Sequence, residues 1–191
     1  MVVIDPLGPG LGLTPFRGKV THAILTNPTD RTMSHVSGLQ GEGAVITSAG
    51  EYSFAGLTVR ALPYRSAHGI WRSIVRLTLD SLNVVHLGAL DRDLSASELS
   101  ELEQTEIHLL LLPIGGGSGL SLRAALRILA ALEPRVVIPV HYQLPALTEK
   151  LDTVESFAKE VGLHFRESLP KVILKASKLP AEERQAYIVR S

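Results

Sequence analysis

Short hydrophobic runs separated by turn residues fill the first half of the chain, and they predict β-strands rather than helices. The clearest strand lies at residues 72–79, where apolar and polar side chains alternate, and a turn at residues 80–83 joins it to the run at 84–87 as a hairpin. A short helix is expected at residues 33–39. The other predicted strands of this half are residues 2–4, 20–25, 44–47, 52–54 and 57–62.

The hydrophobic period changes in the second half, where helices and strands are predicted to alternate. Ser95 and Glu98 have the spacing of a capping box at the start of a helix, and Gly162 ends an amphipathic stretch as a C-terminal cap. The predicted helices are residues 95–102, 121–132 and 147–161. The predicted strands are residues 107–112, 135–140, 171–175 and 185–189.

This order of elements, strand-rich at first and alternating afterwards, favours a layered α/β protein with mixed β-sheets. Residues 109–112 and 136–139 should be buried neighbouring strands, with the helix at 121–132 crossing over between them. A length of 191 residues suits a single domain, and a content of 45% hydrophobic and 20% charged residues excludes a disordered chain.

Composition and charge exclude several classes of function. Without cysteine, the chain cannot form disulfides, Cys-ligated zinc or iron–sulfur sites, or a catalytic thiolate. The 19 basic residues balance the 19 acidic ones, so no electrostatic argument favours nucleic acid or an anionic membrane as a partner. The apolar runs are far shorter than the ~20 residues of a membrane span, and the first residues lack the pattern of a signal peptide. We therefore expect a cytoplasmic protein that binds neither nucleic acid nor membranes.

Three histidines stand at the ends of predicted strands or in turns, namely His35, His68 and His141. Loops at strand ends display functional side chains, and neutral imidazole is the commonest metal ligand, so these residues are candidates for a metal site. A chain with seven histidines also places some of them at strand ends by chance. The spacing alone therefore leaves a structural role open.

A glycine-rich loop of Gly115, Gly116, Gly117 and Ser118 connects a predicted strand with the helix that follows. Its backbone N–H groups could bind an anionic group of a substrate near the helix N-terminus, although such a loop also serves simply as a tight turn. It is not a Walker motif, because Gly-Lys-Ser/Thr is absent. It also lacks the G-x-S-x-G spacing of a serine hydrolase.

Several segments follow one another in the order of a known family. They read Val-Ile-Asp-Pro at residues 3–6, Gly-Glu-Tyr at 50–52, Val-His-Leu-Gly at 85–88, Leu-Pro-Ile-Gly-Gly at 112–116 and Val-Ile-Pro-Val-His-Tyr at 137–142. Together they resemble the metallo-β-lactamase fold, and most closely its small metal-dependent hydrolases related to L-ascorbate-6-phosphate lactonase. The resemblance implies an αββα sandwich of two mixed β-sheets flanked by helices, formed by residues 1–191 as one domain, with a metal site at one edge of the sheets.

The resemblance also assigns roles to individual residues. It makes His68 and His141 metal ligands, and His35 becomes a third ligand if the loop before it is longer than in the family. Asp5 would support the site without touching the metal. Zinc is the implied cofactor, and a small molecule is the implied substrate or ligand.

Two departures remove most of the family's metal ligands. Residues 27–32 read Asn-Pro-Thr-Asp-Arg-Thr where the resemblance implies His-x-His-x-Asp-His, and Ala89 stands where it implies the carboxylate that bridges two metals. Asp30 and Asp91 are alternative ligands. Catalytic zinc usually takes three protein ligands and keeps one open position, so the site is expected to be mononuclear at most.

Two functions follow from these departures. The first is a zinc-dependent hydrolase of small esters or lactones, phosphorylated ones included, with an eroded metal site. The second is a non-catalytic ligand-binding or assembly module derived from the same fold. Because the strand pair that precedes the Asp-Pro element in the family is absent, we also expect either residues encoded upstream of Met1 or a homo-oligomer that covers the exposed strand.

Overall fold

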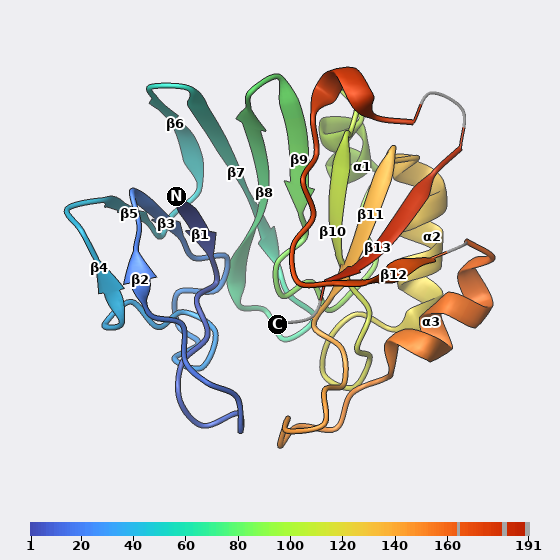
Figure 1. The fold of residues 1–191 in the computed structure, drawn as a ribbon, viewed down its shortest axis with the longest axis horizontal. Helices are drawn as coiled ribbons and strands as arrows, with labels where there is room; N and C mark the ends of the chain where they lie inside the picture. Colours follow the sequence, from blue (N-terminus) through green and yellow to red (C-terminus); the bar gives the residue numbers. More distant parts are fainter. Residues whose placement is uncertain (164, 181–182, 190–191) are drawn as a thin grey trace.

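Two β-sheets of unequal size face each other in the computed structural model, which describes residues 1–163, 165–180 and 183–189 (Figure 1). The larger sheet has eight strands in the order β12-β13-β11-β10-β9-β8-β7-β6. Their bounds are β6 Gly50–Phe54, β7 Leu57–Arg65, β8 Trp71–Leu79, β9 Leu82–His86, β10 Leu109–Pro113, β11 Val136–Val140, β12 Phe165–Leu169 and β13 Gln185–Val189.

The larger sheet is antiparallel in one half and parallel in the other, as the change of hydrophobic period indicates. Each strand from β6 to β9 pairs with the next as an antiparallel hairpin. The turn between β8 and β9 has positive φ at Asp80 and Ser81. Strands β10 and β11 pair in parallel, with Leu109 opposite Val136, so their predicted pairing is confirmed. The helix between them is α2, Leu122–Leu132.

Three helices cover the face of the larger sheet that is turned away from the smaller sheet (Figure 1). They are α1 Ala96–Leu102, α2 Leu122–Leu132 and α3 Val154–Val161. Leu110 and Leu112 on β10 are fully buried beneath these helices, together with Phe157 of α3. Leu111 lies between them on the strand, so its side chain faces the other side of the sheet and is only half-buried.

The smaller sheet contains β1 Val2–Ile4, β3 His22–Ile24 and β5 Ala44–Ile46, and all of its pairings are parallel. Ile24 and Ile46 pack against Val59 and Val75 of the larger sheet and form a second core between the sheets. A separate two-stranded ribbon is formed by β2 Gly18–Lys19 and β4 Leu39–Gln40. The layered α/β fold is thus confirmed, although the smaller sheet is parallel rather than mixed.

Three predicted elements are wrong in type or extent. Residues 33–39 form turns instead of a helix, and Ser34 donates its hydroxyl to the carbonyl of Asn27, a local bond that competes with a helix. The third helix begins at Val154, because the Thr153 side chain caps it there, and residues before that point form a loop.

At the other end of the chain, residues 171–175 are not a strand. The edge strand is β12 instead, and Phe165 anchors it by edge-on contact with Phe157 at 5.9 Å between ring centroids. A short 3₁₀ helix, η1 Ala176–Lys178, follows. None of the described helices is long and apolar enough to cross a membrane.

Candidate functional site

A cavity of about 350 Å³ lies where β1, β9 and β11 end, between the two sheets. Three side chains with acid–base chemistry reach it from these ends: Asp5 follows β1, His86 is the last residue of β9, and His141 follows β11. Glu149, from the loop after β11, adds a second carboxyl group to the wall. The rest of the wall is mainly aliphatic and comes from residues 4–13, β11 and residues 144–151.

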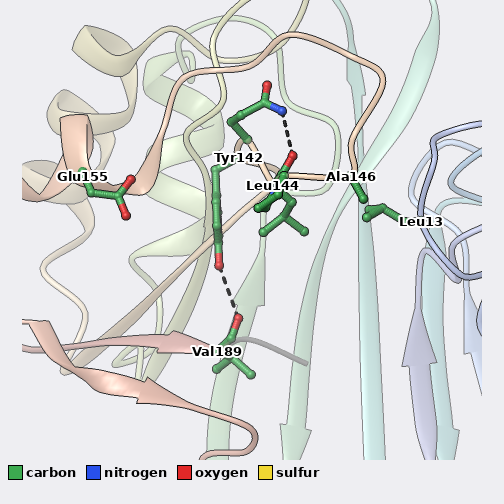
Figure 2. A pocket seen from close by; sticks show the side chains of 8 residues that line it. Leu13, Tyr142, Leu144, Ala146, Glu155 and Val189 are labelled. Atoms are coloured by element: carbon green, nitrogen blue, oxygen red, sulfur yellow. Dashed lines mark hydrogen bonds between the residues drawn. The ribbon is translucent and has the colours of Figure 1, made fainter.

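A groove of about 620 Å³ adjoins the cavity and shares four wall residues with it. These are Leu13, Tyr142, Leu144 and Val189. Figure 2 shows Leu13 facing Ala146 across the groove, while the Tyr142 hydroxyl donates to the carbonyl of Val189 at 3.3 Å. The two hollows together can therefore hold a molecule longer than the cavity alone.

Two loops meet over the cavity and close it on one side. The Thr148 N–H donates to the carbonyl of Leu11 at 3.0 Å, which joins the loop after β1 to the loop after β11. Gly12 has φ +79°, and a Cβ atom there would collide with the backbone carbonyl of Ala146. The contact between the loops thus depends on glycine at position 12.

We expect Gly12→Ala to lower the free energy of unfolding by about 1–3 kcal/mol, because the new methyl group must push the two loops apart at a backbone conformation that already disfavours it. Urea denaturation measures this change. Gly56→Ala is the matched control, because Gly56 has φ +76° and open space around its missing Cβ. If the two variants lose the same stability, the loop contact contributes nothing.

Asp5 is a buried carboxyl held by one neighbour. Its two oxygens accept hydrogen bonds from the Thr26 N–H at 2.7 Å and the Thr26 hydroxyl at 2.6 Å. Removal from water is the largest influence on this group and raises the pKa of Asp5 to about 6, although the bonds from Thr26 act in the opposite direction. Asp5 can therefore gain or lose a proton near neutral pH.

His86 is held in one tautomer by the backbone. Its Nδ1 accepts the N–H of Gly88 at 2.7 Å, so the proton of the neutral ring is on Nε2. Burial lowers the pKa of His86 to about 4, so the ring is neutral at pH 7. Within the described part of the chain, no hydrogen bond is made by Nε2, which leaves one N–H donor in the wall of the cavity.

The structure does not bring the three predicted metal ligands together. His141 lies in the cavity, with Nε2 3.8 Å from a carboxylate oxygen of Glu149. His35 lines a different hollow beside Pro15 and makes a 2.7 Å contact with the hydroxyl of Ser37. His68 is exposed in the turn after β7. Among residues 1–163, 165–180 and 183–189, no group of three or more His, Cys, Asp or Glu side chains is placed to hold a metal ion.

The loop at residues 27–32 satisfies its own polar side chains. Asn27 is buried and accepts the hydroxyl of Thr29 at 2.9 Å, while one oxygen of Asp30 accepts both the N–H and the hydroxyl of Thr32. Asp30, an alternative ligand, is thus engaged within the loop. Amide and hydroxyl groups are poor zinc ligands, so this loop does not fit the metal that the fold implies.

A guanidinium group lies beside Ala89. Arg72 on β8 donates from Nη1 to the carbonyl of Ala89 at 2.6 Å and pairs with Asp91 at 3.2 Å. The side chains are 14% and 1% exposed, and Asp91 also accepts the N–H of Ala67. Asp91, the other alternative ligand, is therefore committed to an arginine. The residues at this end of the sheets do not fit a zinc ion.

Sequence reasoning missed both Arg72 and His86. Arg72 occurs within an alternating strand, where a charged residue is normally solvent-exposed, and only its distant partner Asp91 makes it a buried ion pair. His86 had a usable signal, because it lies near the end of the predicted strand at residues 84–87, just as His141 directly follows the predicted strand at residues 135–140. Its place in the cavity depends on contacts between sheets that the sequence does not reveal.

The glycine-rich loop is held mainly by contacts within the protein. The Gly116 N–H donates to the carbonyl of Leu120, and the Gly119 N–H donates back to Gly116. The carboxylate of Asp152 lies against Gly116, where a Cβ atom would collide with it. Gly115, Gly116, Gly117 and Ser118 therefore form a turn beside a fixed negative charge, and their role toward an anionic substrate group stays a prediction.

Comparison with protein families gives one match across most of the chain. Residues 1–141 match the model of the family described as "Beta-lactamase superfamily domain". A UPF0173 metal-dependent hydrolase from Archaeoglobus fulgidus is 33% identical over 85 residues, which cover 44% of this chain and 35% of that protein. The matched part of this chain thus corresponds to about a third of the length of this curated relative.

Solved structures share the fold at low sequence identity. A Thermotoga maritima protein, classed as a Zn-dependent hydrolase of the metallo-β-lactamase superfamily, has a TM-score of 0.78 at 23% identity, covering 98% of this chain and 89% of its own. Igni18, a metallo hydrolase from Ignicoccus hospitalis, has a TM-score of 0.55 at 20% identity, covering 75% and 72%. These similarities confirm the arrangement of sheets and helices.

Proposed function

Because the chain belongs to the β-lactamase superfamily and yet its own residues do not fit the metal that the fold implies, we propose that it is a ligand-binding member of this superfamily without metal-dependent catalysis. One observation supports this most strongly. The neighbourhood of Ala89 is occupied by the buried Arg72–Asp91 pair, whereas the cavity beside it is open and holds Asp5, His86 and His141. The buried ion pair argues against a metal beside Ala89, and the cavity supports the binding of a small molecule.

A metal-dependent hydrolase is the second candidate. The names of the relatives from Archaeoglobus fulgidus and Thermotoga maritima favour it, and His141 in the cavity is the residue best placed for a metal. In this case the chain would bind a single zinc ion and hydrolyse small esters or lactones, phosphorylated ones included. Such a site would need ligands from residues that now lie apart.

A zinc titration of the purified protein separates the two candidates. After dialysis against a mild chelator, we expect less than one equivalent of tightly bound zinc per chain, no hydrolysis of ester or lactone substrates, and the same melting temperature with and without EDTA. His141→Ala and His22→Ala form the matched pair of variants. One retained zinc that is lost only in His141→Ala, together with hydrolysis, would establish the hydrolase instead.

We also propose that the protein is cytoplasmic and forms a homo-oligomer. Strand β1 is at the edge of the three-stranded sheet, and exposed edges pair readily with another chain. Light scattering of the purified protein tests self-association, and a monodisperse monomer at micromolar concentration would contradict it.

A further inference from the structure

The charges in the wall of the cavity are of one sign. Asp5 and Glu149 contribute carboxyl groups, and the residues that line the cavity include no lysine or arginine. An anionic ligand would therefore meet negative charge with no compensating cation, and like charges at close range lower affinity. This argues against carboxylates and phosphates as the group that enters the cavity.

A cationic ligand is disfavoured for a different reason. Both oxygens of Asp5 are already bonded to Thr26, and the surrounding wall is aliphatic, including Leu7, Leu11 and Leu147. The other carboxylate, Glu149, is 36% exposed and faces His141 Nε2 at 3.8 Å, so water already solvates it. An ammonium group would therefore lose its own water shell in an aliphatic cavity and gain little in return.

His86 presents a donor of known identity to the cavity. The Nε2–H of His86 is fixed as a donor by the bond between Nδ1 and Gly88, and no described residue accepts from it. Gly88 is packed closely against Thr26, because a Cβ atom there would be 2.5 Å from the Thr26 hydroxyl, so the backbone N–H that bonds Nδ1 is held in place. A donor held in this orientation in the cavity wall is complementary to an oxygen acceptor on the ligand.

From these observations we infer that the cavity takes an uncharged, mainly apolar molecule with one oxygen acceptor, such as a hydroxyl or carbonyl, which accepts the Nε2–H of His86. The inference rests on the proposed ligand-binding function and adds the chemical class of the ligand. A cavity of about 350 Å³ is within the range of small-molecule sites, and the adjoining groove receives the rest of the hydrocarbon chain.

Three eight-carbon probes that differ only in the head group test this inference: 1-octanol, octanoate and octylammonium. Binding to the full chain is measured by isothermal titration calorimetry at pH 7.5. We expect 1-octanol to bind at least tenfold more tightly than either charged probe. Octanoate binding as tightly as 1-octanol would overturn the inference, while still leaving a ligand-binding cavity.

Variants locate the binding. His86→Phe keeps an aromatic ring and removes the donor, so the affinity for 1-octanol should fall about five- to tenfold. His22→Phe is the matched control, because His22 packs on Phe54 outside the cavity, and we expect no change. Leu147→Trp fills the cavity and should abolish binding. Equal affinity in His86→Phe and the control would overturn the role of His86.

The outcomes also distinguish this inference from the proposed function. If zinc binds through His141 and esters are hydrolysed, the proposed function fails whichever probe binds. If no zinc binds and octanoate or octylammonium is preferred, only the ligand class is wrong. Failure of all three probes to bind would overturn the inference.

Discussion

Replacing Arg72 with methionine should lower the free energy of unfolding by about 3–5 kcal/mol, the largest single effect that we expect in this protein. The substitution keeps most of the side-chain volume and removes the charge. Asp91, whose side chain is 1% exposed, then stays buried with only the Ala67 N–H as a partner, and the carbonyl of Ala89 loses its donor. A buried carboxylate that loses the cation it is hydrogen-bonded to is strongly destabilising.

Urea denaturation measures this loss, and an exposed ion pair supplies the control. Arg127 and Asp93 pair at 2.7 Å with side chains that are 53% and 54% exposed, so Arg127→Met should leave the unfolding midpoint unchanged within error. Arg72→Met/Asp91→Leu removes both charges and should recover most of the stability. An effect of Arg72→Met as small as that of Arg127→Met would contradict the buried pair.

The contributions of Asp5 and His86 to the stability of the wild-type protein should nearly cancel between pH 4 and pH 6.5, whereas the stabilities of single variants at these two residues should change in opposite directions relative to each other. The pKa of Asp5 is raised from 3.8 to about 6 in the folded protein. As the pH rises through this window, the unfolded chain loses the proton of Asp5 before the folded protein does. The contribution of Asp5 to the free energy of unfolding therefore falls by about 3 kcal/mol across the window.

His86 acts in the opposite sense. Burial lowers its pKa from 6.5 to about 4, so between these values the unfolded chain binds a proton that the folded protein does not. The contribution of His86 to the free energy of unfolding therefore rises by about 3 kcal/mol as the pH increases through this range. The two contributions nearly cancel in the wild type.

Each variant exposes the contribution of the other residue. In Asp5→Asn the free energy of unfolding should rise as the pH increases from 4 to 6.5, and in His86→Phe it should fall. Urea denaturation at several pH values measures both profiles, and other titrating groups drop out when the variants are compared with each other. Parallel profiles for the two variants would show that the pKa of neither group is shifted as described.

The sequence predicted the fold well where each element depends on local pattern and burial. The continuous apolar run that contains β10 led directly to a strand buried in the larger sheet, and the Ser95 capping box led to α1. Residues 171–175 failed as a strand because periodicity alone cannot distinguish a true edge strand from a loop. Phe165 in β12 packs edge-on against Phe157 of α3, and this tertiary contact, together with the pairing to β13, decides which segment forms the edge strand.

The candidate site could be predicted only in part, since it is built from contacts between separate elements. His141 was found because it ends an obvious strand, and it does line the cavity. The environment of Arg72 depends on Asp91 and Ala89 in the loop after β9, so nothing near Arg72 in the sequence indicates a buried charge. The tautomer of His86 depends on the backbone of Gly88, which no residue pattern reveals.

Strand β13 lies between β11 and β12, although it follows both of them in the sequence (Figure 1). During synthesis, β12 has no place in the sheet until residues 185–189 emerge from the ribosome, since β13 is the strand that β12 pairs with. Val189 also contributes to the wall of the cavity and accepts the hydroxyl of Tyr142. This part of the cavity wall is therefore completed late in biosynthesis, and a nascent chain that ends before this strand should have a cavity that is open on that side.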